Sequence, residues 1–409
     1  MTSGVLQDIA LGYQLQWNAQ RQVAGVWLTF EALPFRSVNA AHLLAALQSL
    51  WLPKAPVLTL STNDTQLLTE LLQLDLGASI QLAVQADLLD NPTLAQHVAR
   101  ARQRGMPLVW QGQVGQTPLP AQALNFNQQA LSLSPEQALL ALRASLHRQH
   151  GSHAQPHARL GSPVQAGQLV DGVPSQVLVK HCLDEQGAAA VIGWPMEDVL
   201  YNFRQTRIQP SLACVRQVLQ SIAADASMDQ VEQQLGQDPV LAYRFLRFLN
   251  SAGLGLDRAI DSLRQGLTVL GLSRTATWLR ELAPHASQDL DLEPIRQGLA
   301  LRARFMAQML DAGESDALRR ELFLCGLLSH IDWLLGENMA SALRTVPLPT
   351  RITEALLSQE GPYWPFLAIA SALENPLPHP ADDLCAQHAF DLEEVNQTLL
   401  RSLAELCTA

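Results

Sequence analysis

Four histidines lie close together in one polar segment: His147, His150, His153 and His157. Imidazole nitrogens are common zinc ligands, so this spacing raises the question of a metal site. Gly151 and Pro156 interrupt any helix that would align the rings, and neither cysteine nor carboxylate completes the set. We therefore predict an exposed, mobile loop over about 147–163 rather than a metal site.

The adjacent residues His181 and Cys182 are a second candidate for chemistry. A thiol nucleophile needs a base within hydrogen-bond distance, but neighbours on a helix point about 100° apart. We predict that both belong to a buried helix face. The five cysteines form no Cys-x-x-Cys pair and are predicted to be reduced, mostly buried thiols. No Gly-x-Gly-x-x-Gly or Walker sequence is present to cradle phosphates.

His330 and Asp332 are the third candidate, because a divalent ion is held by converging histidine and carboxylate ligands. Residues two apart on a helix point about 200° apart and do not share an ion. We therefore predict a structural or capping role for His330, and no catalytic, cofactor-binding or metal-binding residue. The alternative is a metal-dependent nucleotide hydrolase that uses an unusual set of ligands: His330, Asp332, His285 and Asp289.

A charged helix that begins at Asp238-Pro239 suggests binding instead of catalysis. Asp238 is suited to cap the free N–H groups, and Pro239 fits the first turn. Arg244 and Arg247 share one side of this helix, where they either dock an anionic partner or pair with surface acids. The candidate interaction surface consists of Asp238, Arg244, Arg247, Asn250, Ser251, Asp261 and Arg264.

The composition limits the classes of protein that these residues can serve. The chain has 409 residues, 48% hydrophobic and 16% charged, which predicts packed cores in two or three domains. A net charge of −11 disfavours nucleic-acid binding. No apolar stretch approaches the roughly 18 residues of a membrane span, and the N-terminus lacks the features of a signal peptide. We expect a cytoplasmic protein.

Short β-type runs alternate with amphipathic segments from residue 12 to about 195, which is typical of helices covering a largely parallel sheet. The predicted strands are Gly12–Trp17, Val23–Phe30, Pro56–Leu60, Ser79–Val84, Pro107–Gln111, Leu124–Phe126 and Ala188–Gly193. The predicted helices are Val38–Leu50, Thr65–Leu74, Pro92–Arg104, Pro135–His147 and Ser175–Glu185. Whether this half closes into a full barrel stays open, because eight-stranded barrels typically need about 250 residues.

From about residue 205 onward, the apolar residues have helical spacing and predict an all-α bundle of short antiparallel helices. We therefore predict an α/β domain over 1–203 and an all-α domain over 204–409, with the boundary near 201–211.

The second half resembles the HDOD domain of bacterial signalling proteins. The resemblance rests on QDPVLAYRFLRFLNSAGLG at 237–255, AIDSLRQGLTVLGLSRTATWL at 259–279, LFLCGLLSHIDWLLG at 322–336, and the segment that starts at Val346. The HDOD fold is related to the HD superfamily of metal-dependent phosphohydrolases, but usually lacks the metal ligands. This chain has no His-Asp dipeptide, and Ser329 and His330 stand where HD enzymes carry that pair.

The first half resembles a degenerate EAL domain, the barrel of cyclic-di-GMP phosphodiesterases, in its strand order, in Gly12-Tyr13 and in Ile192-Gly193-Trp194-Pro195. Active EAL sites hold two metals on carboxylates. Here the resemblance sets Gln14, Trp110-Gln111 and Asn125-Phe126-Asn127 at those positions, and Gln81–Gln85 contains no Glu. Amides do not neutralise two divalent cations. We interpret the literal Glu31-Ala32-Leu33 as chance, because it follows the second strand without acidic neighbours.

The resemblances together predict a non-enzymatic regulatory protein that acts through protein contacts of its HDOD domain, beside a catalytically inactive EAL-like domain. Expected partners are other signalling proteins, not nucleic acid or membrane, and no cofactor is expected. An acidic bundle is equally compatible with a monomer and a homodimer. The alternatives are a cyclic-di-GMP sensor without hydrolysis, and the HD-type phosphohydrolase.

Overall fold

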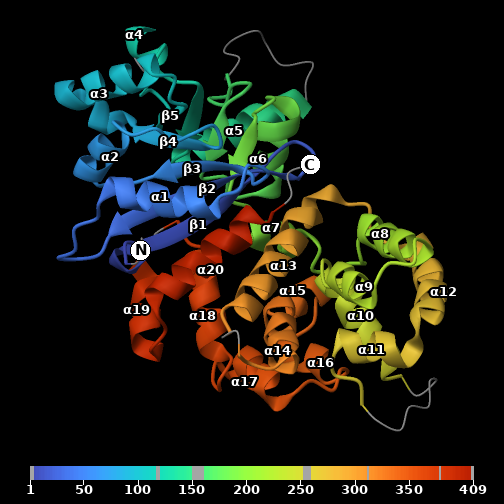
Figure 1. The fold of residues 1–409 in the computed structure, drawn as a ribbon. Helices are drawn as coiled ribbons and strands as arrows, with labels where there is room; N and C mark the ends of the chain where they lie inside the picture. The colour runs from blue at the N-terminus through green and yellow to red at the C-terminus, as the bar shows by residue number, and fades with distance from the viewer. Residues whose placement is uncertain are drawn as a thin grey trace. The chain divides into compact units, whose positions relative to one another are not determined.

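The structure is a computed structural model and describes residues 4–116, 120–149, 161–251, 259–310, 313–376 and 379–406. The chain divides into two compact units, one formed by Met1–Pro195 with Ala372–Ala409 and the other by Met196–Ser371. The first contains a β-barrel surrounded by helices, and the second is helical. The predicted order, an α/β part followed by a helical part, is confirmed (Figure 1).

Eight strands form a closed barrel in sequence order, so the question of closure is settled. They are β1 (Ile9–Trp17), β2 (Val23–Ala32), β3 (Val57–Ser61), β4 (Ile80–Gln85), β5 (Leu108–Gln113), β6 (Gln128–Ser132), β7 (Leu169–Asp171) and β8 (Ala190–Ile192). Strand β1 is antiparallel to β2 and to β8, whereas neighbouring strands from β2 to β8 are parallel. The connecting helices are α1 (Ala40–Leu50), α2 (Thr65–Leu71), α3 (Pro92–Gln103), α4 (Pro120–Ala123), α5 (Pro135–Gln149) and α6 (Gln176–Lys180).

Two strands differ from the sequence prediction. The predicted strand Leu124–Phe126 is wrong, because β6 begins at Gln128. Strand β7 was not predicted, since its three residues are too few for an alternating pattern to show. Both strands are identified by their neighbours in the barrel rather than by their own composition.

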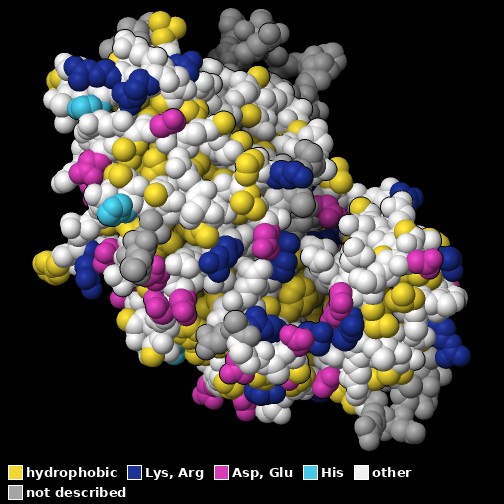
Figure 2. Space-filling model, viewed as in Figure 1, with side chains coloured by type: hydrophobic (Ala, Val, Ile, Leu, Met, Phe, Trp, Pro, Cys, Tyr) yellow, Lys and Arg dark blue, Asp and Glu magenta, His cyan; other side chains and the backbone are white. Residues whose placement is uncertain are grey.

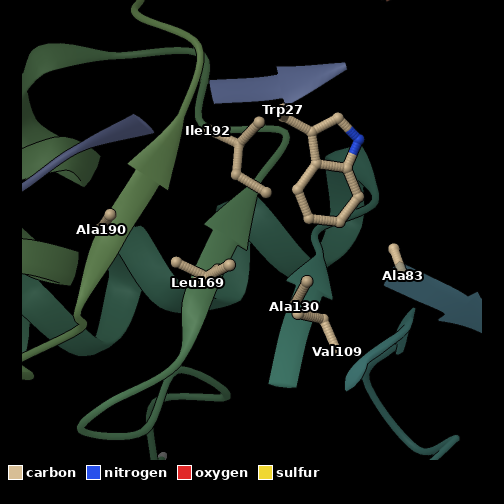
Figure 3. Close-up of a cluster of buried hydrophobic side chains, with 7 residues drawn as sticks. All are labelled: Trp27, Ala83, Val109, Ala130, Leu169, Ala190 and Ile192. Atoms are coloured by element: carbon tan, nitrogen blue, oxygen red, sulfur yellow. The ribbon is translucent and has the colours of Figure 1, made fainter. Parts of the chain in front are cut away.

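The lumen of the barrel is filled by one layer of buried side chains (Figure 3): Trp27, Ala83, Val109, Ala130, Leu169, Ala190 and Ile192. They come from six strands, and only the lumen brings side chains of so many strands together. Because side chains alternate along a strand, residues two or four positions further along the same strand face the lumen as well. This layer therefore fixes which residues reach the carboxyl end of the barrel.

Two C-terminal helices, α19 (His379–His388) and α20 (Leu392–Ala404), pack with the barrel, in contrast to the predicted single all-α domain over 204–409. In Figure 1, α20 lies along α1. The buried Asn396 side chain donates to the carbonyls of Leu6 (2.8 Å) and Ile9 (3.0 Å), just before and at the start of β1. Helical spacing identifies a helix but not the surface that it covers, which is why the sequence did not show this return.

The second unit consists of short helices, with no strand among its described residues. They are α7 (Met196–Asn202), α8 (Leu212–Ala223), α9 (Met228–Leu235), α10 (Pro239–Leu249), α11 (Leu263–Leu270), α12 (Leu272–Leu282), α13 (Glu293–Gln308), α14 (Asp316–Leu327), α15 (Ile331–Leu335), α16 (Met339–Leu343), α17 (Thr350–Ser358) and most of α18 (Trp364–Leu373). Asp238 caps α10 as predicted, accepting from Val240 N–H (2.8 Å) and Leu241 N–H (3.0 Å). Among the described residues of both units, no helix has the length and apolar character of a membrane span.

Gly326 allows α13 and α14 to approach closely. A Cβ at Gly326 would lie 2.8 Å from Ala303 Cα and 2.8 Å from Met306 Sδ. We expect Gly326→Ala to lower the free energy of unfolding by about 1–3 kcal/mol, because the backbone at Ala303 cannot yield as a flexible side chain would. Urea unfolding of the purified variant measures this. Gly298→Ala on α13 is the matched control, because its Cβ would meet nothing within 4 Å, and it should gain up to about 1 kcal/mol of helix propensity. Equal effects at the two glycines would contradict the packing argument.

Candidate functional site

The carboxyl end of the barrel carries a ring of polar side chains above the apolar layer of the lumen. Two positions beyond Ala83, Val109, Ala130 and Leu169 come the following residues: Gln85, Gln111, Ser132 and Asp171. Gln14 pairs with Trp27 across β1 and β2 and so faces the lumen too. We call Gln14, Glu31, Gln85, Gln111, Ser132 and Asp171 the barrel mouth. In parallel α/β barrels this end carries the active site.

Hydrogen bonds between strands position several side chains of the barrel mouth. Asn63, just beyond β3, donates to Glu31 Oε1 (3.0 Å) and accepts from Gln85 Nε2. Ser61 Oγ donates to Gln111 Oε1 over a long 3.4 Å. These contacts link the ends of β2, β3, β4 and β5. The mouth therefore offers positioned neutral donors and acceptors, which suit the recognition of a polar ligand.

Asp171 is the acid of the mouth on β7, and the sequence analysis missed it. Burial raises the pKa of the Asp171 carboxyl above the usual value. Hydrogen bonds from Gly172 N–H and Ser132 lower this pKa, but their effect is smaller than that of burial. A carboxyl with a raised pKa keeps its proton to higher pH than a solvated carboxyl does. The available signal was the Asp-Gly that ends LVDG, but β7 was too short to be predicted as a strand.

The residues set on EAL catalytic positions lie at different depths in the structure. Gln14 and Gln111 do reach the barrel mouth. Trp110 has the opposite strand parity to Gln111 and is buried. Asn127 precedes β6, and its Oδ1 accepts from Leu108 N–H (3.0 Å) at the start of β5, so residues 125–127 do not lie at the carboxyl end of a strand.

Glu31 also lies elsewhere than predicted. It belongs to β2 and does not follow it, and it has the same strand parity as Trp27. Its carboxylate is therefore part of the barrel mouth, so the interpretation of Glu31-Ala32-Leu33 as a chance match does not account for its position. Gly12, on the same face of β1, leaves room for the carbonyl of Asn375, which would stand 2.3 Å from a Cβ there.

The two-metal site implied by the EAL resemblance does not fit the donor set of the barrel mouth. The described residues contain no group of three or more His, Cys, Asp or Glu side chains placed to hold a metal ion. Amide oxygens carry no net charge to balance divalent cations. We therefore derive no catalytic step through a metal at this site.

His181 has partners other than its neighbour Cys182. Its Nε2 lies 2.8 Å from Ser162 Oγ, and its Nδ1 lies 2.8 Å from Glu185 Oε2. The predicted burial is confirmed, since both His181 and Cys182 are fully buried. Burial raises the pKa of the Cys182 thiol to about 12, which keeps it protonated and unreactive. Cys214, Cys325 and Cys385 are free and buried as well, and Cys407 lies outside the described residues.

His330 precedes α15 but does not cap it. Its Nδ1 lies 3.1 Å from Arg302 Nη1, which also donates to Ser329 Oγ at 2.7 Å. Burial and the Arg302 charge lower the pKa of His330 to about 3, so the ring is neutral at physiological pH. The alternative ligand set of His330, Asp332, His285 and Asp289 forms no metal-binding group among the described residues.

The seven residues of the predicted interaction surface differ in exposure. Arg247, Ser251 and Asp261 are exposed. Asp238 is fully buried and does not belong to a surface, because its carboxylate caps α10 and pairs with Arg296.

The other three surface residues are partly buried. Asn250 is held by Leu246 and Ile260, and Arg264 pairs with Asp229. Arg244 lines a cavity that is described below. Of the predicted loop over 147–163, residues 150–160 and the side chain of His147 lie outside the described residues.

Comparison with known proteins identifies part of the chain. The family model of the HDOD domain matches residues 210–345, within the helical unit. The chain is 26% identical over 208 residues to "Cyclic di-GMP phosphodiesterase CdgJ" of Vibrio cholerae, covering 49% of this chain and 46% of the relative. It is 26% identical over 186 residues to "Uncharacterized protein YuxH" of Bacillus subtilis, covering 43% of each chain. The matched part thus spans less than half the length of these relatives. No solved structure matches the chain.

These comparisons change one prediction and support another. The HDOD domain is present where the sequence resemblance set it. The comparison contradicts the prediction that the chain is not an enzyme. One relative is named a phosphodiesterase, and this name points to enzymatic activity.

Proposed function

We propose that this protein works in cyclic-di-GMP signalling, and that its barrel is an EAL-type module that binds the dinucleotide at the barrel mouth. The single observation that carries the proposal is the ring of lumen-facing polar side chains at this end of the barrel, including Gln14, Gln111 and Asp171. The relative named as a cyclic di-GMP phosphodiesterase supports the identity of the ligand.

The chemistry of the mouth suits the two parts of this ligand. Guanine presents donors and acceptors along its edges, and primary amides match both kinds. Asp171 carries a carboxyl whose pKa is raised by burial; it keeps its proton to higher pH than a solvated carboxyl and, when protonated, donates to a phosphate oxygen. Recognition through neutral hydrogen bonds accounts for the many amides at these strand ends.

Exchanging Gln111 for leucine tests the proposal. Gln111→Leu keeps the approximate size of the side chain but removes its hydrogen bonds, so we expect cyclic di-GMP to bind about tenfold more weakly, the effect of about 1.4 kcal/mol. Isothermal titration calorimetry of the full chain measures the affinity, and chromatography of the same samples measures hydrolysis. Gln66→Leu, on the exposed side of α2, is the control and should bind like the wild type.

Either of two results would contradict the proposal. One is a folded wild-type protein that shows no heat of binding with millimolar cyclic di-GMP. The other is a Gln111→Leu variant with unchanged affinity, because the ligand would then lie elsewhere.

We further infer that the helical unit transmits the signal by contacting other signalling proteins. Its match to the HDOD domain supports this role. Arg247 and Ser251 at the end of α10, with Asp261 before α11, are exposed and available for such contacts.

A further inference from the structure

Several arginines of the helical unit are paired with carboxylates. Basic and acidic side chains lie interspersed over this unit on the face shown in Figure 2. The ion pairs include Arg207 with Glu337, Arg264 with Asp229, and Arg351 with Glu321. Arg244 on α10 is half-buried, yet no hydrogen bond or ion pair joins its guanidinium to another described residue, whereas Arg247 and Arg274 are exposed to solvent.

Asp238, the carboxylate that favours the charge of Arg244, is already engaged. It accepts from the N–H groups of Ser211 (2.6 Å), Val240 and Leu241, and pairs with Arg296 at 3.2 Å. Burial lowers the pKa of Arg244, and the nearby positive charges of Arg207 and Arg247 lower it further. The guanidinium is thus a half-buried cation close to two other arginines, a position in which a bound anion would be stabilised.

A cavity of about 570 Å³ adjoins Arg244, lined by Gln209, Arg244, Trp278, Glu281, Leu282 and His285. This volume is within the range of small-molecule sites. Helix α12 supplies Trp278 and Glu281, whereas α10 supplies Arg244. Trp278 is held by two aromatic neighbours, stacked on Phe248 and tilted against Phe245, both with ring centroids at 5.5 Å. The lining of the cavity therefore includes the aromatic ring of Trp278, the guanidinium of Arg244 and the carboxylate of Glu281.

We propose that this cavity of the HDOD unit binds a guanine nucleotide, which is a site beyond the barrel mouth. Trp278 supplies an aromatic surface of the kind on which nucleobases stack. The Glu281 carboxylate accepts from the N1–H and N2–H groups of guanine, donors that adenine does not offer together. Arg244, with His285 at the rim, pairs with the phosphate. The cavity thus offers a cation to the phosphate and a carboxylate to the base of the same nucleotide.

Titration calorimetry of the full chain with GMP, AMP and inorganic phosphate tests the site. We expect GMP to bind, AMP at least tenfold more weakly, and phosphate more weakly still. Arg244→Gln should reduce the affinity for GMP about tenfold or more, because it removes a charge-assisted contact. Arg274→Gln is the matched control, since Arg274 is an exposed arginine of α12 that does not line the cavity.

Glu281→Gln separates base recognition from phosphate binding. This variant should lose most of the preference for GMP over AMP while it still binds the phosphate group. Three results would overturn the proposal: no binding of GMP, equal binding of AMP and GMP by the wild type, or unchanged GMP affinity in Arg244→Gln. Gln111→Leu in the barrel should leave GMP binding at this cavity intact, so failure here and failure at the barrel mouth are distinguishable.

Discussion

Asp238→Ala is expected to lower the free energy of unfolding of the helical unit by about 3–5 kcal/mol, the cost of leaving a buried charge without its partner. Asp238 and Arg296 are both buried, and their side chains approach to 3.2 Å. The same carboxylate accepts from Ser211 N–H before α8 and from two N–H groups at the start of α10. Its removal thus unpairs a guanidinium and three backbone donors together.

Urea unfolding followed by circular dichroism measures the effect of Asp238→Ala. Ser227→Ala is the control, because Ser227 is also an N-cap but lies at the partly exposed start of α9. Loss of an ordinary cap costs about 1 kcal/mol. If the two variants lose equal stability, the Asp238–Arg296 pair is not what holds α8, α10 and α13 together.

Acidification from about pH 6.5 to pH 3 should destabilise the helical unit through His330 by on the order of 3–5 kcal/mol, at about 1.4 kcal/mol for each pH unit. The pKa of His330 is lowered to about 3 in the fold, first by burial and then by Arg302. In this window the unfolded chain binds a proton on His330 and the folded chain does not. The contribution of neutral His330 to the free energy of unfolding is therefore complete above pH 6.5 and is lost as the pH falls to 3.

His330→Asn isolates this contribution, because the amide places a neutral acceptor near the position of Nδ1, facing Arg302. We expect the stability difference between wild type and variant to change steeply between pH 6.5 and 3 and to be flat above pH 7. Thermal unfolding at a series of pH values measures the difference. The neighbouring Asp332, whose pKa burial raises, is present in both proteins and cancels in the comparison. A difference independent of pH would show that His330 has the same pKa in the folded and unfolded protein, which would contradict the prediction.

Local sequence patterns predicted those features that depend on residues a few positions apart. Asp238-Pro239 marked the start of α10, and alternating apolar residues marked β1 to β5. The amides at the strand ends were visible too, and Gln14 and Gln111 reach the barrel mouth. Caps and strand alternation arise from local geometry, so the residues that cause them are adjacent in the sequence.

The HDOD assignment came from sequence resemblance, and the family model supports it. The prediction that the chain is not an enzyme was wrong. It depended on the absence of carboxylates at the positions where active EAL domains hold metals. Asp171 was also overlooked and Glu31 dismissed, since strand β7 and the end of β2 were not recognised.

The sequence by itself determined the two architectures, most of their elements and the polar character of the barrel strand ends. Only the tertiary structure decided that α19 and α20 return to the barrel, that Asp238 is buried against Arg296, and that Arg244 and Trp278 line one cavity. Each of these pairs residues that are far apart in the chain. Such contacts are selected by the packing of whole elements, and no short sequence pattern records which surfaces will meet.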